Sequence, residues 1–290
     1  MKNLNIKIVG LGDGGARAIG KMIAAGVGKG KGVEFIAIGN DENIMLTSSA
    51  RKNIFLNRDL TTIYKSVTDA LDGTKLIFIV GGLGSNAARS AVPIIMSRAK
   101  NFGAMTVAFV CKPFVMEPVL RKSNAEYTLA NLRGNVDTLF CVPVEKFFVF
   151  RINQPQVSIA EVFDIADDIF CQGVKIFLDM LAESDSSLAL FRWGNAAFGY
   201  GISTSALNAI QAAVKFPTIE ENDLANAEGI FVRLTGGRNL SSGAVEIAND
   251  FIRQKLRDDA EFFSQVDTDK TLGDKIFASI ILTRKLIDKP

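Results

Sequence analysis

The chain has 290 residues, of which 48% are hydrophobic and 22% are charged, and this length and composition indicate a globular protein with room for two domains. Its 33 basic and 31 acidic residues leave a net charge of +2, so we expect no polyanion-binding face and no nucleic acid partner. The complete absence of histidine excludes His-based acid–base and triad catalysis and removes a usual ligand of zinc.

The cysteines and the N-terminal residues indicate the cellular compartment of the protein. Cys111, Cys141 and Cys171 lie far apart and are odd in number, which argues against a disulfide framework and favours a reduced environment. The first residues enter an apolar strand pattern without the features of a secretory signal, and no apolar stretch is long enough to span a bilayer. We therefore expect a cytoplasmic protein without direct membrane insertion.

Short apolar runs alternate with amphipathic segments through the first half of the chain. Strands are predicted at residues 6–9, 34–38, 76–80, 105–111 and 138–142. This alternation is typical of an α/β fold with a Rossmann-like parallel sheet that is covered by helices. Ligands of such sheets bind at the carboxyl ends of the strands, where glycine-containing segments fall at residues 10–15, 39–41 and 81–85.

The first of these segments, Gly-Leu-Gly-Asp-Gly-Gly at residues 10–15, joins the first predicted strand to a helix. Glycines permit a tight turn and a close approach to phosphate, and the N–H groups at the start of the helix attract an anion. The spacing also satisfies the GxGxxG pattern of dinucleotide sites, with Asp41 after the second strand in the place of a ribose-binding acid. Besides phosphate binding and dinucleotide binding, a third interpretation is a tight turn that serves only the packing of the helix on the strand.

The second half of the chain has a different pattern. Residues 157–181 form one long amphipathic segment, and Ser158 with Glu161 predicts a capping box at its start. The elements predicted after it are a helix at 203–215, a strand at 229–234, a helix at 241–255 and a strand at 276–283. This order indicates a smaller α/β domain.

An ordered set of segments spans nearly the whole chain. They lie at residues 32–38, 113–117 with Arg121, 134–139, 157–174, 229–237 and 272–276. Together they resemble the tubulin/FtsZ superfamily, and the bacterial FtsZ branch in particular. The resemblance implies a GTPase-like nucleotide domain at 1–156, a central helix at 157–182 and a smaller C-terminal α/β domain at 183–290. We expect a protein without the C-terminal tail of FtsZ.

The resemblance also assigns binding residues. In FtsZ-like proteins two glycine loops wrap the phosphates of GTP, a glutamate and an arginine hold the ribose, and an aspartate on the central helix reads guanine. Here Glu117 and Arg121 match the ribose pair, and Asp167 matches the aspartate that accepts N1–H and N2–H of guanine. The loop residues carried over are Gly12, Asp13, Gly14, Gly15, Arg17, Gly82, Gly84, Ser85 and Asn86. The implied cofactors are GTP or GDP, with Mg²⁺ if GTP is hydrolysed.

The second loop departs from the family pattern, because Ala87 and Arg89 replace threonines while Ala88 and Ser90 replace glycines. Where positive φ is needed, such residues adopt it at a cost of about 1–2 kcal/mol, so we expect a weakened phosphate cradle. The alternative is that this segment begins a helix, with Arg89 or Arg17 replacing the lost donors by charge.

Two positions near the expected base also differ from the family. Arg17 stands where the family has the asparagine that closes the first loop, and Val144 stands in place of a second asparagine that contacts the base. Since each hydrogen bond contributes about 1 kcal/mol, we expect a weak or altered nucleotide preference.

Hydrolysis is expected to be weak or absent. The family loop that covers the γ-phosphate is shortened at residues 57–60, and the positions of the two water-positioning aspartates fall on Ser184 and Ser187. Asp185 is the best remaining catalytic candidate, with Glu183 as the alternative, and it would orient water across a protomer interface with Mg²⁺.

Each candidate also has an interpretation without function. Glu117 and Arg121 are four residues apart and can form a surface pair. Asp167 can belong to a solvated helix face together with Asp164 and Asp168. Asp185 can be an ordinary polar loop residue.

Three functions remain open from the sequence. The first is an FtsZ-like cytoskeletal protein that binds guanine nucleotide and assembles with itself into a longitudinal filament. The second is a nucleotide-free, noncatalytic relative that acts as a partner of another FtsZ-type protein. The third is an NAD-dependent enzyme.

Overall fold

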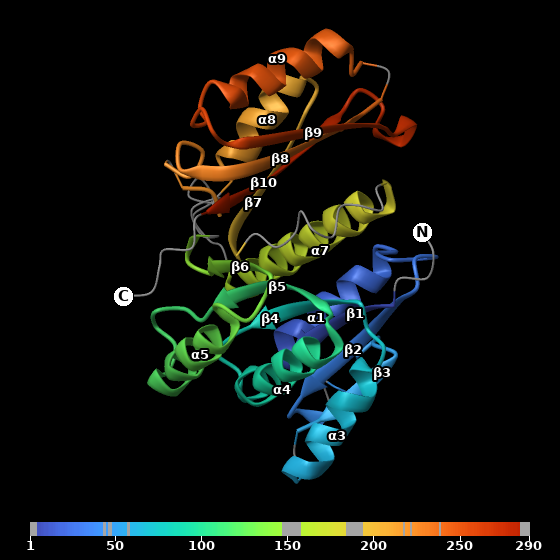
Figure 1. The fold of residues 1–290 in the computed structure, drawn as a ribbon, viewed down its shortest axis with the longest axis vertical. Helices are drawn as coiled ribbons and strands as arrows, with labels where there is room; N and C mark the ends of the chain where they lie inside the picture. Colours follow the sequence, from blue (N-terminus) through green and yellow to red (C-terminus); the bar gives the residue numbers. More distant parts are fainter. Residues whose placement is uncertain are drawn as a thin grey trace. The chain divides into compact units, whose positions relative to one another are not determined.

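The computed structural model describes residues 5–42, 45, 48–56, 59–146, 158–183, 194–216, 218–220, 222–237 and 239–284. The chain divides into two compact units, Met1–Arg192 and Trp193–Pro290, whose elements are labelled in Figure 1. The long helix after residue 158 belongs to the first unit. The expected division into three functional parts stays a prediction.

Six described strands of the first unit form a parallel sheet in the order β3-β2-β1-β4-β5-β6. They are β1 (Ile6–Leu11), β2 (Val33–Gly39), β3 (Lys52–Phe55), β4 (Leu76–Gly82), β5 (Met105–Lys112) and β6 (Thr138–Pro143). The five predicted strands are confirmed. The pattern misses β3, an edge strand of four residues that begins with an exposed lysine, because it is too short and polar to stand out.

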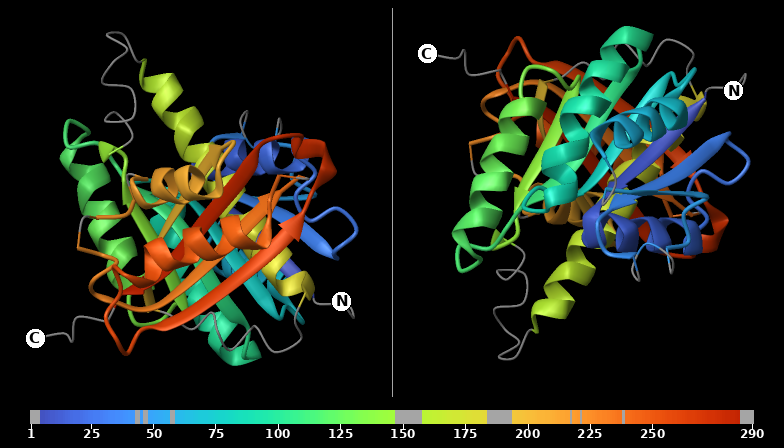
Figure 2. Two further views of the ribbon diagram at one scale, coloured as in Figure 1. Left: turned by 90° about the horizontal axis from the view of Figure 1, so that it is seen from above. Right: turned by 90° about the horizontal axis from the view of Figure 1, so that it is seen from below.

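Helices cover both faces of this sheet (Figures 1 and 2). On one face α3 (Leu60–Leu71) packs against α4 (Asn86–Phe102), which packs against α5 (Val119–Leu132). On the other face α1 (Gly12–Ala24) packs against α7 (Ile159–Glu183). The predicted Rossmann-like arrangement is thereby confirmed for this unit.

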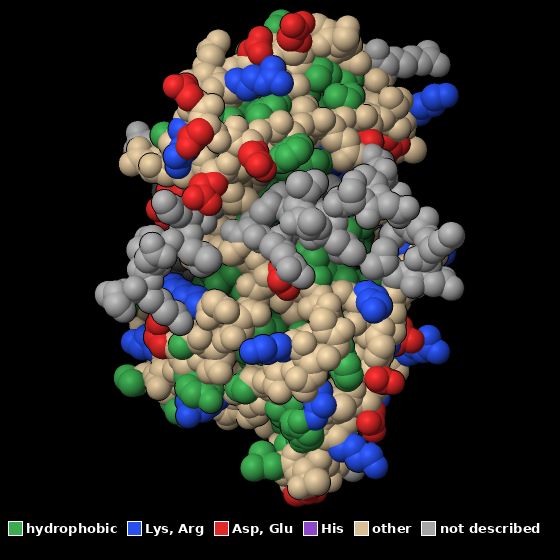
Figure 3. Space-filling view, viewed as in Figure 1, with side chains coloured by type: hydrophobic (Ala, Val, Ile, Leu, Met, Phe, Trp, Pro, Cys, Tyr) green, Lys and Arg blue, Asp and Glu red, His purple; other side chains and the backbone are tan. Residues whose placement is uncertain are grey.

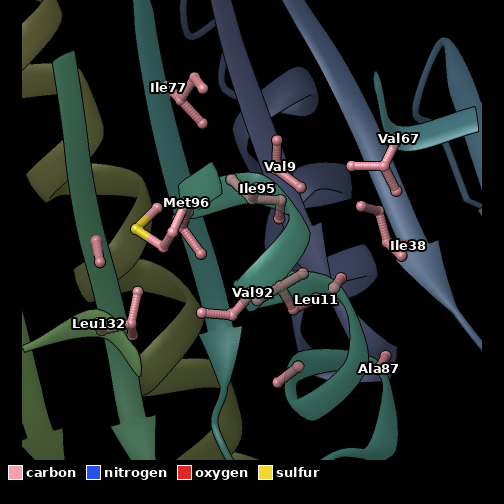
Figure 4. Close-up of a cluster of buried hydrophobic side chains, with 14 of the residues drawn as sticks. Val9, Leu11, Ile38, Val67, Ile77, Ala87, Val92, Ile95, Met96 and Leu132 are labelled. Atoms are coloured by element: carbon pink, nitrogen blue, oxygen red, sulfur yellow. The ribbon is translucent and has the colours of Figure 1, made fainter. Parts of the chain in front are cut away.

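The face that carries α4 holds a continuous apolar core, part of which is drawn in Figure 4. Its labelled members are Val9, Leu11, Ile38, Val67, Ile77, Ala87, Val92, Ile95, Met96 and Leu132. Because strand side chains alternate between faces, Ile77 of β4 lies in this core while Phe78 contacts α7 on the other face. Both faces are buried, so these strands read as unbroken apolar runs.

The helix α7 is fixed to the second face by aromatic packing. Its Phe177 meets the edges of Phe78, Phe109 and Phe140, with ring centroids 5.6 to 6.1 Å apart. At its start, Ser158 N–H donates to Glu161 and Glu161 N–H donates to Ser158 Oγ, which confirms the predicted capping box. This packing places the middle of α7 beside the carboxyl ends of the strands.

Within the second unit the strands are hydrogen-bonded in the order β7-β10-β8-β9. The strands are β7 (Gly194–Ser203), β8 (Ala227–Gly236), β9 (Glu261–Thr268) and β10 (Ile276–Arg284), and the helices are α8 (Ala206–Val214), α9 (Ser242–Arg253) and the 3-10 turn η2 (Lys270–Leu272). β10 runs antiparallel to β7 and β8, whereas β8 and β9 are parallel. The predicted α/β character of this unit is confirmed.

The sequence pattern misses β7 and β9, and it begins the helix α8 three residues too early. In β7 the glycines hide the strand signal, because they serve close packing: a Cβ on Gly201 would lie 2.3 Å from the carbonyl oxygen of Ala209 in α8. β9 is a mostly exposed strand at the edge of the sheet, so its composition is close to that of a loop.

Basic and acidic side chains of the described residues are interspersed over the face shown in Figure 3. This distribution agrees with the small net charge of +2. No helix in the described part of the chain is both long enough and apolar enough to cross a bilayer.

Candidate functional site

A cavity of about 340 Å³ lies in the first unit where the parallel strands end. Its walls come from the ends of β1, β4 and β5, from the segment after β6, and from α1, α5 and α7. The lining residues are Leu11, Asp13, Gly14, Arg17, Gly82, Gly84, Ser85, Cys111, Lys112, Pro113, Glu117, Arg121, Val144, Phe163, Ala166, Asp167 and Phe170. Its volume is within the range of small-molecule sites, about 300–1,000 Å³.

The first glycine segment turns β1 directly into α1. Gly12 has a φ of +65°, a conformation that glycine adopts without strain. The N-cap of α1, Leu11, makes no side-chain hydrogen bond to the first turn, so the N–H groups of that turn are not capped by it. Asp13 and Gly14 line the cavity.

Gly15 has a different task from Gly14. A Cβ at Gly15 would lie 2.5 Å from the carbonyl carbon of Gly10 and 2.9 Å from the carbonyl oxygen of Val80. It therefore lets α1 pack closely on the sheet, and neither Gly12 nor Gly15 is among the residues that line the cavity. Gly15 thus serves packing, and nucleotide binding by the backbone of Gly12, Gly14 and Gly15 stays a prediction.

The second segment forms the N-terminus of α4, as the alternative interpretation predicted. Ser85 is the N-cap, and its hydroxyl oxygen accepts the N–H of Ala88 at 3.0 Å. Ala87 to Ser90 are helical, and no described residue other than glycine has a positive φ. The predicted strain at these positions is therefore wrong. Their side chains suit a helix, since Ala87 and Ala88 are buried in the core.

Arg89 does not enter the cavity lining. It donates to Asn124 Oδ1 at 3.3 Å and lies over the ring of Tyr127 at 4.5 Å. Asn86, expected to bind nucleotide, accepts a hydrogen bond from Asn124 Nδ2 at 2.9 Å and also lies outside the lining. The suggestion that Arg89 replaces lost phosphate donors is therefore not supported by this geometry.

Asn124 is a site residue that the sequence analysis missed. It is buried on α5, and its amide also contacts the carbonyl oxygen of Gly84 at 3.4 Å. No signal in the sequence indicated this role, because packing decides that the amide is buried, and a buried amide needs partners. It holds the second segment against α5.

Glu117 and Arg121 both line the cavity and form an ion pair across the start of α5. Glu117 Oε1 also accepts the N–H of Phe114 at 2.8 Å. Pro118 between them is the N-cap of α5. The pair is thus a real i,i+4 contact, yet it belongs to the cavity wall.

Asp167 is buried, with only 2% of its side chain exposed. Arg17 on α1 holds both carboxylate oxygens: Nε donates to Oδ2 at 2.5 Å, and Nη2 donates to Oδ1 at 3.4 Å. Burial raises the pKa of the Asp167 carboxyl to about 6, and the Arg17 guanidinium opposes that rise. The neighbours Asp164 and Asp168 are exposed. The interpretation as a solvated helix face therefore describes these two residues and is wrong for Asp167.

The wall beside Asp167 is apolar. Val144, Phe163, Ala166 and Phe170 line it, and the Arg17 guanidinium lies 5.2 Å from the centre of the Phe163 ring. Two phenyl rings and a buried carboxylate form a pocket suited to a planar polar ring.

Cys111 also lines the cavity. Burial raises the pKa of its thiol to about 12, so it stays protonated and is a poor nucleophile. Cys111, Cys141 and Cys171 are all free.

Several expected residues lie outside the description or outside the cavity. Asp185, Ser184 and Ser187 are not among the described residues, and the same holds for the side chain of Glu183. Asp41, the acid of the dinucleotide interpretation, is exposed and does not line the cavity. Among the described residues, no three acidic or cysteine side chains are grouped to hold a metal.

Comparisons with known proteins match both units. The model "Tubulin/FtsZ family, GTPase domain" matches residues 57–150, and "FtsZ family, C-terminal domain" matches residues 194–284. Cell division protein FtsZ 2 of Rhizobium meliloti (strain 1021) is 29% identical, over 96% of this chain and 87% of that protein. Cell division protein FtsZ 1 of the same strain is 28% identical over 96% of this chain, which spans only 51% of that relative.

Solved structures show the same fold. An empty FtsZ dimer from M. jannaschii superposes with a TM-score of 0.83 at 24% identity, covering 97% of this chain and 88% of that one. A GTPγS-bound protofilament of CetZ2 from Haloferax volcanii gives a TM-score of 0.78 at 16% identity, covering 97% and 93%.

Proposed function

Since the chain belongs to the tubulin/FtsZ family and has its fold, we propose that it binds a guanine nucleotide in the cavity of its first unit and assembles with itself into filaments. Hydrolysis of GTP is weak or absent in this proposal. The observation that carries it is the convergence of nine of the twelve expected binding residues on one cavity.

The order of these residues along the cavity supports one orientation of the nucleotide. The uncapped start of α1 and the start of α4 offer backbone N–H groups and helix dipoles to the phosphates. Glu117 and Arg121 follow for the ribose, and Asp167 lies among the phenyl rings for the base.

Asp167 is the residue that selects guanine in this proposal. A carboxylate accepts the N1–H and N2–H groups of guanine together, whereas the corresponding edge of adenine presents an acceptor at N1. Because the carboxylate is buried, a ligand that displaces Arg17 must itself donate hydrogen bonds to both carboxylate oxygens.

Hydrolysis of GTP would need a bound metal ion and a positioned water molecule. Because the described residues hold no ready cation site, Mg²⁺ would be bound mainly through the nucleotide's phosphate oxygens, whose charge it would neutralise. We assign the orientation of the attacking water to Asp185, completed across a protomer interface. Asp185→Ala is then expected to abolish any turnover and to spare nucleotide binding.

Self-assembly is supported by an apolar surface beside the cavity. We call it the 115–120 surface: Val115, Met116, Val119 and Leu120 are 65 to 82% exposed, and they flank the cavity residues Glu117 and Arg121. Exposed apolar groups gathered in this way mark interaction sites. We assign the surface to a second copy of this chain.

The nucleotide content of the purified protein, released by acid, tests the binding proposal. Guanine nucleotide supports it, and an adenine dinucleotide would contradict it. An empty preparation is followed by calorimetric titration with GDP. If the protein fails to bind GDP at millimolar concentration, the better function is that of a nucleotide-free partner of another FtsZ-type protein. The Arg17–Asp167 ion pair also favours this alternative, because it fills the position proposed for the base.

Sedimentation and negative-stain microscopy with GTP, with GDP and without nucleotide test assembly. Met116→Glu is expected to reduce the sedimented fraction at least about fivefold, since a charge would be buried in the contact. Leu60→Glu is the matched control, because Leu60 is equally exposed, on α3, away from the cavity lining. Equal loss in both variants, or in neither, would remove the 115–120 surface from the assembly contact.

A further inference from the structure

Within the chain itself, Arg17 occupies the carboxylate that the proposed function gives to guanine. Two N–H groups of its guanidinium point at the two oxygens of Asp167, at 2.5 and 3.4 Å. Both residues line the cavity. The base position therefore already holds a ligand, and that ligand is a side chain of the protein.

The chemical match between the two ligands is close. The N1–H and N2–H groups of guanine belong to a guanidine unit of the ring, and they form the same pair of parallel donors that arginine presents to a carboxylate. Asp167 is 2% exposed, so a ring can approach its oxygens only through the space that Arg17 lines. The two ligands need the same lone pairs.

The two partners of the pair differ in how easily they move. Asp167 is fixed in the packed middle of α7, whereas the Arg17 side chain is 45% exposed and lies against the face of Phe163. Arg17 can therefore turn toward water and remain hydrated, while Asp167 would lose a charge-assisted bond unless a new donor replaced it.

We propose that Arg17 is an internal competitor of guanine, so that nucleotide binds only when Arg17 leaves Asp167 and the strength of the ion pair sets the affinity and the base selectivity of the site. This inference rests on the proposed binding of guanine at Asp167. The observed affinity equals the intrinsic affinity multiplied by the fraction of chains in which Asp167 is open.

Removing the competitor is expected to strengthen binding. If Arg17 holds Asp167 in nine chains of ten or more, Arg17→Ala and Arg17→Asn each increase the affinity for GDP by about tenfold or more. Calorimetry measures this at pH 8, above the pKa of about 6 that the Asp167 carboxyl has in the wild type. IDP, which lacks the 2-amino group, is expected to bind more weakly than GDP in every protein, because it offers Asp167 one donor instead of two, and to gain by the same factor as GDP, because both bases need the open carboxylate.

Lys21→Ala is the matched control. Lys21 lies one turn further along α1, and its Nζ contacts Asp168, the next residue of α7, at 2.7 Å, without lining the cavity. Its removal deletes the same charge from the same helix and is expected to change GDP affinity less than twofold. Thermal denaturation of every variant shows whether the fold survives, and Arg17→Asn keeps a donor in case alanine leaves the carboxylate too costly to bury.

The outcomes separate this inference from the function on which it rests. Stronger GDP binding by both Arg17 variants, with a similar factor for IDP, supports competition. Equal or weaker GDP binding by folded Arg17 variants overturns it and leaves the guanine site in place. Absence of GDP binding in the wild type and in all variants overturns both proposals.

Discussion

The two ends of the cavity present different chemical groups. At the end formed by α1 and α4, the proposed binding groups are backbone N–H groups, which Gly12 and the cap Ser85 place by conformation. At the other end the groups are side chains, Asp167 and Arg17 against an apolar wall. A backbone site survives substitutions that keep the helix, whereas a side-chain site changes with each one. The family's glycines could thus become Ala88 and Ser90 without loss of the helix start, while Arg17 and Val144 changed the side chains of the base end.

The largest effect is expected at the side-chain end. Asp167→Ala removes both acceptors for guanine and is expected to weaken GDP binding about 100-fold or more, since two hydrogen bonds to a charged group are lost. Calorimetric titration measures it. Asp168→Ala, at the exposed neighbour that pairs with Lys21, is the control and is expected to change affinity less than twofold. Similar losses in both variants would contradict the assignment of the base to Asp167.

At the backbone end, a substitution should act through packing. Gly15→Ala places a Cβ 2.5 Å from the backbone of Gly10, so α1 must shift and the unit is expected to lose about 1–3 kcal/mol of unfolding free energy. Gly20→Ala in the same helix meets nothing within 4 Å and is expected to stabilise by about 1 kcal/mol. Denaturant unfolding compares the two, and equal stabilities would show that Gly15 is not needed for close packing.

The base end should also respond to pH, because it holds the buried carboxyl of Asp167, whose pKa is raised. Burial raises the folded-state pKa of Asp167 from an ordinary value of 3.8 to about 6. The ionised carboxylate therefore destabilises the folded chain above pH 6, and this penalty disappears as the pH falls from about 6 towards 4.

Asp167→Asn removes the titration and supplies the comparison. Relative to this variant, the wild type is expected to gain about 1–3 kcal/mol of stability between pH 7.5 and pH 4.5. Thermal denaturation of both proteins across this range measures the difference. A constant difference would mean that the carboxyl of Asp167 titrates at its ordinary value.

Much of the fold was predictable because its signals are local. The apolar runs of β1, β2, β4, β5 and β6 and the capping box at Ser158 and Glu161 are visible in consecutive residues. β7 was missed because Gly199 and Gly201 serve contacts with α8, and a contact with a distant element leaves no periodic pattern.

The sequence predicted which residues form the candidate site better than it predicted what each of them does. Resemblance assigned Asp167, Glu117 and Arg121 to one ligand, and they line one cavity. It did not separate Gly15, which packs against Gly10, from Gly14, and it placed Asn86 at the nucleotide without the buried Asn124 that holds it. Such roles depend on which atoms meet in the folded chain, as Asn86 and Asn124 do across 38 positions.

The alternation of strands and helices, the family resemblance and the candidates for binding are all visible in the sequence, because propensity, periodicity and motif spacing are properties of neighbouring residues. Three features become visible only in the folded chain: Ala87 to Ser90 continue a helix, Arg89 lies on Tyr127, and Arg17 reaches Asp167 across 150 positions. The physical reason is that the partners of a buried charge are chosen by packing, which brings α1 and α7 together on one face of the sheet.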